Sequence, residues 1–102
     1  MAAAYTTTRV IHHNTTKSLL DGVVRWLKTG PSPNDAEWQA HTDLVQVCLA
    51  EMVEMSVNPP KGASSRYVHL LVNRATPHVR SMLTAMRKHD RPTALAHGET
   101  TF

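Results

Sequence analysis

One cysteine and seven histidines are the side chains with the widest chemical reach in this chain of 102 residues. Cys48 lies between Val47 and Leu49, and the charged residues nearest to it in the sequence are acids. A thiol becomes a nucleophile only as a thiolate, which needs a nearby base or a positive environment. We therefore expect Cys48 to be a buried, unreactive side chain rather than a catalytic residue.

The histidines do not have the spacing of a metal site. They are His12, His13, His41, His69, His78, His89 and His97. Zinc prefers four ligands, and helices commonly supply them as pairs three or four residues apart. No two of these histidines have that separation, and only one cysteine is present to complete a set. The sequence therefore predicts no metal site and no cofactor.

Two carboxylates have a spacing that invites an enzymatic hypothesis. Glu51 and Glu54 are three residues apart, which places them on one face of a helix. The chain contains no glycine-rich phosphate loop, no nucleophile elbow and no HExxH pattern. The simpler interpretation is a solvated helix edge, or an edge that docks on a basic segment. We therefore expect a protein that is not an enzyme.

The segment of residues 73–89 combines an apolar stripe with a basic side on the helical wheel. The basic residues of this region are Arg74, Arg80, Arg87, Lys88 and Arg91. In a straight helix the row from Arg80 to Arg91 would be about 16 Å long. Such a row has three uses. It can dock on an acidic protein surface, follow the phosphates of a nucleic acid such as duplex RNA, or remain a solvated face.

Charge is segregated along the chain. Residues 29–60 contain five acids and no lysine or arginine, whereas residues 61–91 contain seven lysines and arginines and one acid. Asp43, Glu51 and Glu54 form an acidic edge that can attract the basic row, within one chain or between chains. Residues 73–89 also lack a Phe, Trp or Tyr side chain on which bases could stack.

The leading hypothesis is therefore a small helical subunit or adaptor that packs into a larger protein assembly or a homo-oligomer. The alternative is an α-helical protein that binds duplex RNA by shape and by phosphate contacts.

Apolar residues recur with helical spacing in three stretches. The pattern predicts a first helix over residues 16–28 and a second that ends at residue 56 or 57. Two signals mark the start of the second helix, Ser32 followed by Pro33 and Asn34 followed by Glu37. A third begins at Ser64 or Ser65. Within the first, Gly22 costs helix stability, which we interpret as the mark of a close helix contact.

Pro77 interrupts the last helical stretch. Proline lacks a backbone N–H and its ring clashes with the preceding turn, so we expect a restart or a kink at Thr76 and an end near His89. From Asp90 onward no apolar pattern continues. We therefore predict an all-α bundle of three or four helices over residues 15–89, with flexible arms at residues 1–14 and 90–102.

Composition and the chain ends bear on location and partners. A single cysteine allows no intrachain disulfide, which favours a reducing compartment. No acid precedes Asp21, a weak sign of mitochondrial targeting beside a cytosolic location, and no apolar run is long enough to span a membrane. Glu99-Thr-Thr-Phe102 also matches the C-terminal pattern that PDZ domains bind as an added strand.

Overall fold

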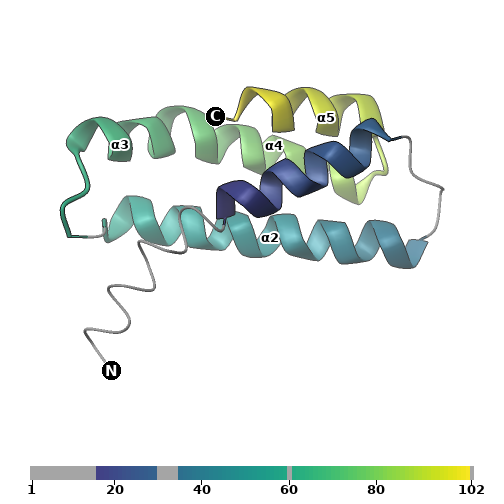
Figure 1. Ribbon diagram of the computed structural model, residues 1–102, viewed down its shortest axis with the longest axis horizontal. Helices are drawn as coiled ribbons and strands as arrows, with labels where there is room; N and C mark the ends of the chain where they lie inside the picture. Colours follow the sequence, from purple (N-terminus) through teal and green to yellow (C-terminus); the bar gives the residue numbers. More distant parts are fainter. Residues whose placement is uncertain (1–15, 30–34, 60, 102) are drawn as a thin grey trace.

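The computed structural model describes residues 16–29, 35–59 and 61–101, and these residues are helical almost throughout (Figure 1). The elements are a first helix over residues 16–28, α2 (Asp35–Val57), α3 (Ser65–Leu70), a π-helical turn η1 (Leu71–Ala75), α4 (Thr76–Arg87) and α5 (Arg91–Thr100). The described residues contain no strand. The predicted all-α fold is confirmed, and the predicted N-terminal arm lies outside the described residues.

The frame of the bundle is an antiparallel pair of long helical segments (Figure 1). α3, η1 and α4 run in line beside α2, so that Tyr67 Oη lies 3.8 Å from Met55 Sδ at one end. At the other end the rings of Trp38 and His89 stack with centroids 4.8 Å apart. The first helix crosses this pair, and α5 lies alongside α4.

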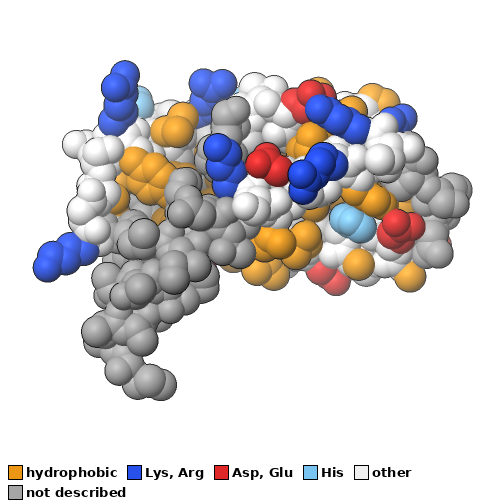
Figure 2. Space-filling view, viewed as in Figure 1, with side chains coloured by type: hydrophobic (Ala, Val, Ile, Leu, Met, Phe, Trp, Pro, Cys, Tyr) orange, Lys and Arg blue, Asp and Glu red, His pale blue; other side chains and the backbone are white. Residues whose placement is uncertain are grey.

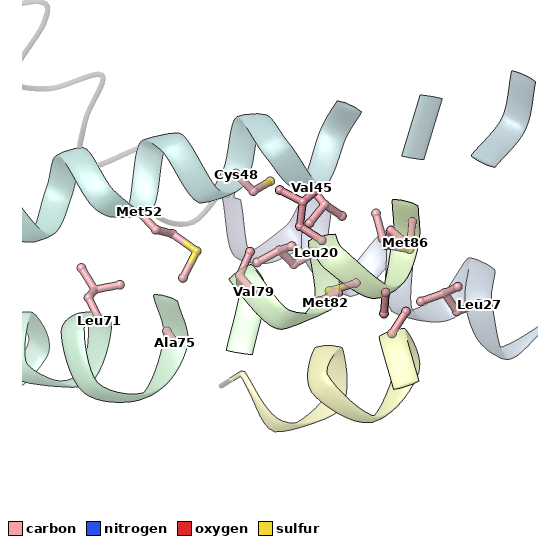
Figure 3. Close-up of a cluster of buried hydrophobic side chains, with 14 of the residues drawn as sticks. Leu20, Leu27, Val45, Cys48, Met52, Leu71, Ala75, Val79, Met82 and Met86 are labelled. Atoms are coloured by element: carbon pink, nitrogen blue, oxygen red, sulfur yellow. The ribbon is translucent and has the colours of Figure 1, made fainter. Parts of the chain in front are cut away.

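The core is built from leucine, valine and methionine side chains, with few aromatic residues. Figure 3 shows side chains of the first helix, α2, η1 and α4 converging in the centre of the bundle. The fully buried large side chains include Leu27, Val45, Met52, Met55, Leu71, Val79, Met82 and Met86. Methionine is flexible, and it fills the irregular space where helices cross at different angles.

Pro77 does not restart the helix. The chain keeps right-handed helical angles through Ala75 and Thr76, and the distortion lies one turn earlier, in η1. There the Thr76 N–H donates to Leu71 O, five residues back, which widens the turn. The wider turn gives the proline ring room against the carbonyl four residues earlier. The predicted restart at Thr76 is therefore wrong, and the predicted irregularity is a π-turn within one continuous helical run.

The predicted C-terminal tail is also wrong, because residues 91–100 form α5. The Asp90 side chain accepts from the Thr93 N–H at 3.3 Å and caps the helix, with Pro92 in its first turn. Such a start is favourable because the proline gives up no hydrogen bond there. α5 packs through the small residues Ala94, which is fully buried, and Gly98.

Gly98, and not Gly22, marks the close helix contact. A Cβ atom on Gly98 would lie 2.7 Å from Val24 Cγ2 of the first helix and 3.2 Å from Met82 Cε of α4. A Cβ atom on Gly22 would have nothing within 4 Å. The prediction for Gly22 is therefore wrong, and α5 sits close to its neighbours because residue 98 lacks a side chain.

Candidate docking surface

Arg91 is not part of a basic row, because the chain turns before it. α4 ends at Arg87, and His89 takes a left-handed conformation with φ 54°. The N–H groups of His89 and Asp90 then bond back to Met86 O and Ala85 O, which closes the helix end in a Schellman motif. The straight row from Arg80 to Arg91 that the sequence predicted is therefore wrong.

Arg91 instead caps the first helix. Its Nε donates to Leu27 O at 2.5 Å, and its Nη2 donates to Lys28 O at 3.2 Å. Carbonyl groups in the last turn of a helix have no partner within the helix and carry partial negative charge. The guanidinium group therefore ties the start of α5 to the end of the first helix.

Arg74 has a similar role at the other end of α5. Its Nε donates to Thr100 O at 3.4 Å, in the last turn of that helix. Lys88 is exposed at the end of α4, beside a small polar hollow whose lining includes Thr93 and His97. Of the five predicted basic docking residues, Arg74 and Arg91 therefore bond to helix ends. Lys88 lies apart from Arg80 and Arg87.

Arg80 and Arg87 lie together on the wall of a groove between α2 and α4. The groove has a volume of about 530 Å³. Its lining is Gln46, Leu49, Ala50, Val53, Arg80, Leu83, Thr84 and Arg87. Both arginines are exposed, and Arg87 Nη2 lies 3.5 Å from Gln46 Oε1 across the groove. The floor is apolar, so the groove combines a hydrophobic strip with two cations.

The three acids of the predicted acidic edge do not all lie on the same side of α2. Asp43 is exposed and accepts from Gln39 Nε2 at 2.8 Å, while Glu54 accepts from Asn58 Nδ2 at 3.1 Å. At 100° per residue, Asp43 and Glu54 fall beside Ala50 on the outer margin of the groove. Glu51 falls farther round the helix and is half-buried. The groove therefore has a basic α4 margin and an acidic α2 margin.

The first helix covers a different side of α2. Cys48 Sγ lies 4.0 Å from Thr16 O, and the ring of His41 stacks on Trp26 with centroids 3.9 Å apart. These positions are about 120° to 160° around α2 from Gln46 and Val53. Figure 2 shows the face that carries the first helix and α5, where basic and acidic side chains alternate. The groove therefore lies on a side of α2 away from the first helix.

An aromatic cluster closes the end of the bundle where α2 begins. Trp26 and Trp38 meet edge to face at 4.9 Å, and Trp26 Nε1 donates to Glu37 Oε1 at 2.8 Å. The His41 ring stacks on Trp26, and the His89 ring stacks on Trp38. These two histidines are packing elements that fix the first helix and the α4–α5 turn to α2.

The remaining candidates for chemistry are Cys48 and the other histidines. Cys48 is buried, and burial raises the pKa of its thiol to about 11. His78 and His97 are 19 residues apart in the sequence, but their Nδ1 atoms lie 3.2 Å apart across α4 and α5. The sequence did not predict this pair, because it depends on α5. Within the described ranges, no group of three or more His, Cys, Asp or Glu side chains is placed to hold a metal ion.

The C-terminal segment is held in a folded arrangement. Glu99 and Thr100 belong to α5, and Lys28 Nζ forms an ion pair with Glu99 Oε2 at 3.4 Å. Thr101 is buried, with its hydroxyl donating to His97 O at 2.9 Å. Binding to a PDZ domain as an added strand would require these residues to leave the helix.

The groove could not be located from the sequence alone. The pattern of α2 indicates a wide apolar arc, but it does not say which part of the arc each neighbour covers. Every helix among the described residues is too short or too polar to span a lipid bilayer. Comparison with protein-family models, with curated proteins and with solved structures gives no match.

Proposed function

We propose that this protein is a non-enzymatic helical subunit that docks on a partner protein through the groove between α2 and α4. The observation that carries the proposal is the groove itself, whose apolar floor is bordered by Arg80 and Arg87. The occupant that fits is an amphipathic helix with carboxylates along one edge. Its apolar face would cover Leu49, Val53 and Leu83, while its carboxylates would meet the two guanidinium groups.

The charge distribution favours a protein over a nucleic acid. Arg74 and Arg91 donate to helix carbonyls, which leaves Arg80 and Arg87 as the pair on the groove, about 10 Å apart along α4. Phosphates gain nothing from an apolar floor, and Asp43 and Glu54 at the opposite margin repel them. A helix from a protein uses both the floor and the cations.

The state of the reactive side chains supports a docking role rather than catalysis. The Cys48 thiol is buried with a raised pKa, and the rings of His41 and His89 are stacked on tryptophans. These groups serve the packing of the bundle. Among the hollows formed by the described residues, the groove combines an apolar floor with two exposed arginines.

The test is a titration of labelled helical peptides of about 20 residues with the full chain. Binding is measured as the fluorescence anisotropy of the labelled peptide. One peptide carries Leu and Ala on its apolar face and Glu at two edge positions seven residues apart, and the matched peptide carries Lys at those positions. We expect the Glu peptide to bind at least about tenfold more tightly, because two ion pairs replace two repulsions. Arg80→Glu with Arg87→Glu should reverse the preference.

The same titration includes duplex RNA of about 20 base pairs at low and high salt. Equal binding of the two peptides would overturn the proposal. So would salt-sensitive RNA binding that is tighter than binding of the Glu peptide and is lost in the double variant.

A further inference from the structure

We infer that the groove is covered by the same surface of a second copy of the chain, related to the first by a two-fold axis that is parallel to α2 and α4. This inference rests on the proposed docking role of the groove and names its partner. It follows from the fact that the two margins of the groove carry opposite charges, so the surface is complementary to itself.

The symmetry places each helix on the correct neighbour. A two-fold axis that runs along the groove exchanges its two sides, so α2 of one copy lies over α4 of the other. Within one chain α2 and α4 are already antiparallel, as the Trp38–His89 and Met55–Tyr67 contacts show. The axis leaves the direction of each helix unchanged, so the contact between copies is antiparallel as well. The result is a four-helix arrangement in which every neighbour is antiparallel.

The arginines of one copy and the acids of the other also lie at matching heights along the two-fold axis. Arg87 lies level with Gln46, because their side chains meet at 3.5 Å, and Asp43 is less than one turn from Gln46. Arg80 shares the groove lining with Ala50 and Val53, next to Glu54. A rotation about an axis parallel to the helices does not change height. Asp43 of the second copy therefore comes to the level of Arg87, and Glu54 to the level of Arg80.

Exposed apolar side chains extend the strip on α2. Val57 is 69% exposed and continues the line of Gln46, Ala50 and Val53 at helical spacing. Val47 is 64% exposed and lies beside Asp43 and Glu54 on the acidic margin. Together with the apolar floor of the groove, these side chains form one continuous exposed strip, and a continuous apolar strip marks an interaction surface.

The available area is enough for a reversible dimer. α2 has 23 residues, so a strip as long as α2 and two helices wide covers about 700 Å² on each copy. Specific protein interfaces bury about 800 Å² on each partner. We therefore expect a dissociation constant on the order of micromolar, since charged margins add specificity more than affinity.

The experiment is sedimentation equilibrium of the full chain from about 1 to 200 µM, a range that brackets the expected constant. Two charge-reversed variants are compared with the unaltered chain: Arg80→Glu with Arg87→Glu, and Asp43→Arg with Glu54→Arg. We expect each variant alone to dimerise at least about tenfold more weakly, because each places like charges opposite one another. An equal mixture of the two should form a heterodimer, because the reversed charges then face each other.

The matched control is Lys17→Glu with Arg25→Glu, which reverses two exposed charges on the first helix. This variant should dimerise like the unaltered chain, and circular dichroism melts should establish that all three variants are folded. A chain that stays monomeric at 200 µM overturns the inference. A dimer that ignores the Arg80 and Arg87 reversals, or a mixture with no heterodimer, overturns it too. If the chain is monomeric but binds the Glu peptide, the inference falls and the proposed function stands; if it does neither, both fall.

Discussion

The two sides of α2 differ in what covers them. On one side Val45, Cys48 and Met52 are at most 1% exposed, under the first helix and the α3–α4 run. On the other side the strip of Gln46, Ala50, Val53 and Val57 borders the groove. Both sides are rich in small and medium apolar residues, so hydrophobicity alone does not distinguish the core of this chain from the surface that we propose for docking.

The arginines also fall into two groups, those that bond to helix ends and those that line the groove. Arg74 and Arg91 donate to carbonyls in the last turns of α5 and of the first helix, so their charge serves the fold. Arg80 and Arg87 extend from the middle and end of α4 toward the groove. A basic residue opposite the end of a neighbouring helix thus stabilises the bundle, whereas a basic residue along an open groove is available for docking.

The largest expected difference is between truncations on the two sides of α2. Met52→Ala should lower the free energy of unfolding by about 2–4 kcal/mol, because it leaves a cavity where four elements meet. Val53→Ala, one residue later but half-buried at the groove, should cost less than about 1 kcal/mol. Urea denaturation followed by circular dichroism measures both values.

The titration with the Glu peptide should rank Met52→Ala and Val53→Ala in the opposite order, because it measures affinity for the peptide rather than stability. Val53→Ala should weaken binding of the Glu peptide, while folded Met52→Ala should bind it as the unaltered chain does. If Val53→Ala destabilised the chain as much as Met52→Ala, the groove would belong to the core and the comparison would fail.

The next effect separates two glycines that look alike in the sequence. Gly98→Ala should destabilise the fold by about 1–2 kcal/mol, because its Cβ would press on Val24 and Met82. Gly22→Ala should stabilise it by about 0.5–1 kcal/mol, because its Cβ meets nothing and alanine favours the helix. Thermal denaturation of the two variants measures both signs, and a stable Gly98→Ala protein would mean that α5 is not packed closely.

These glycines illustrate how far the sequence can predict the fold. The first helix and α2 were predicted within a residue or two, because their large apolar residues repeat at helical spacing and turn residues bound them. α5 was missed because it packs through Ala94 and Gly98, and small residues produce no apolar stripe. Its start signal, Asp90 followed by Pro92, was present but had no stripe to support it. The π-turn was also beyond prediction, since proline indicates a disturbance without fixing how the backbone absorbs it.

Arginine substitutions test the division of the basic residues. Arg91→Ala should cost about 1–2 kcal/mol of stability, because two carbonyls at the end of the first helix lose a charged donor. Arg87→Ala should change stability by less than about 0.5 kcal/mol, since its side chain is exposed beside the groove. Urea denaturation compares them, and equal losses would contradict the assignment of Arg87 to docking.

The residues of the candidate site were named from the sequence, but their arrangement was not. Residue types and charge blocks led to the prediction that Arg80, Arg87 and Asp43 are docking residues, and that role stays a prediction. Their arrangement depends on which side of α2 the first helix covers and on the turn at His89, which removes Arg91 from the row. Both are tertiary facts, and the local sequence of α4 does not contain them.

The smallest expected effect at neutral pH is the contribution of the Cys48 thiol to the free energy of unfolding. Because burial raises the pKa of Cys48 from 9.0 to about 11, the folded chain keeps this thiol neutral while the unfolded chain ionises it. The unfolded state then binds fewer protons between pH 9 and 11, so the stability contributed by Cys48 is present below pH 9 and is lost as the pH rises toward 11. The difference in unfolding free energy between the unaltered chain and Cys48→Ala should decline over that interval.

A labelling experiment at pH 8 compares the two sides of α2 directly. In a Cys48→Ala background, the thiol introduced by Ala50→Cys lies on the groove side and should react with a disulfide reagent at the rate of an exposed cysteine. Cys48 in the unaltered chain should react about 100-fold more slowly, since less of its thiol is ionised and the first helix covers it. A second copy seated in the groove should slow the thiol at position 50 as the protein concentration rises and leave the rate of Cys48 unchanged. A concentration-independent rate at position 50, in a chain that sedimentation has found to be dimeric, would place the dimer contact on another face.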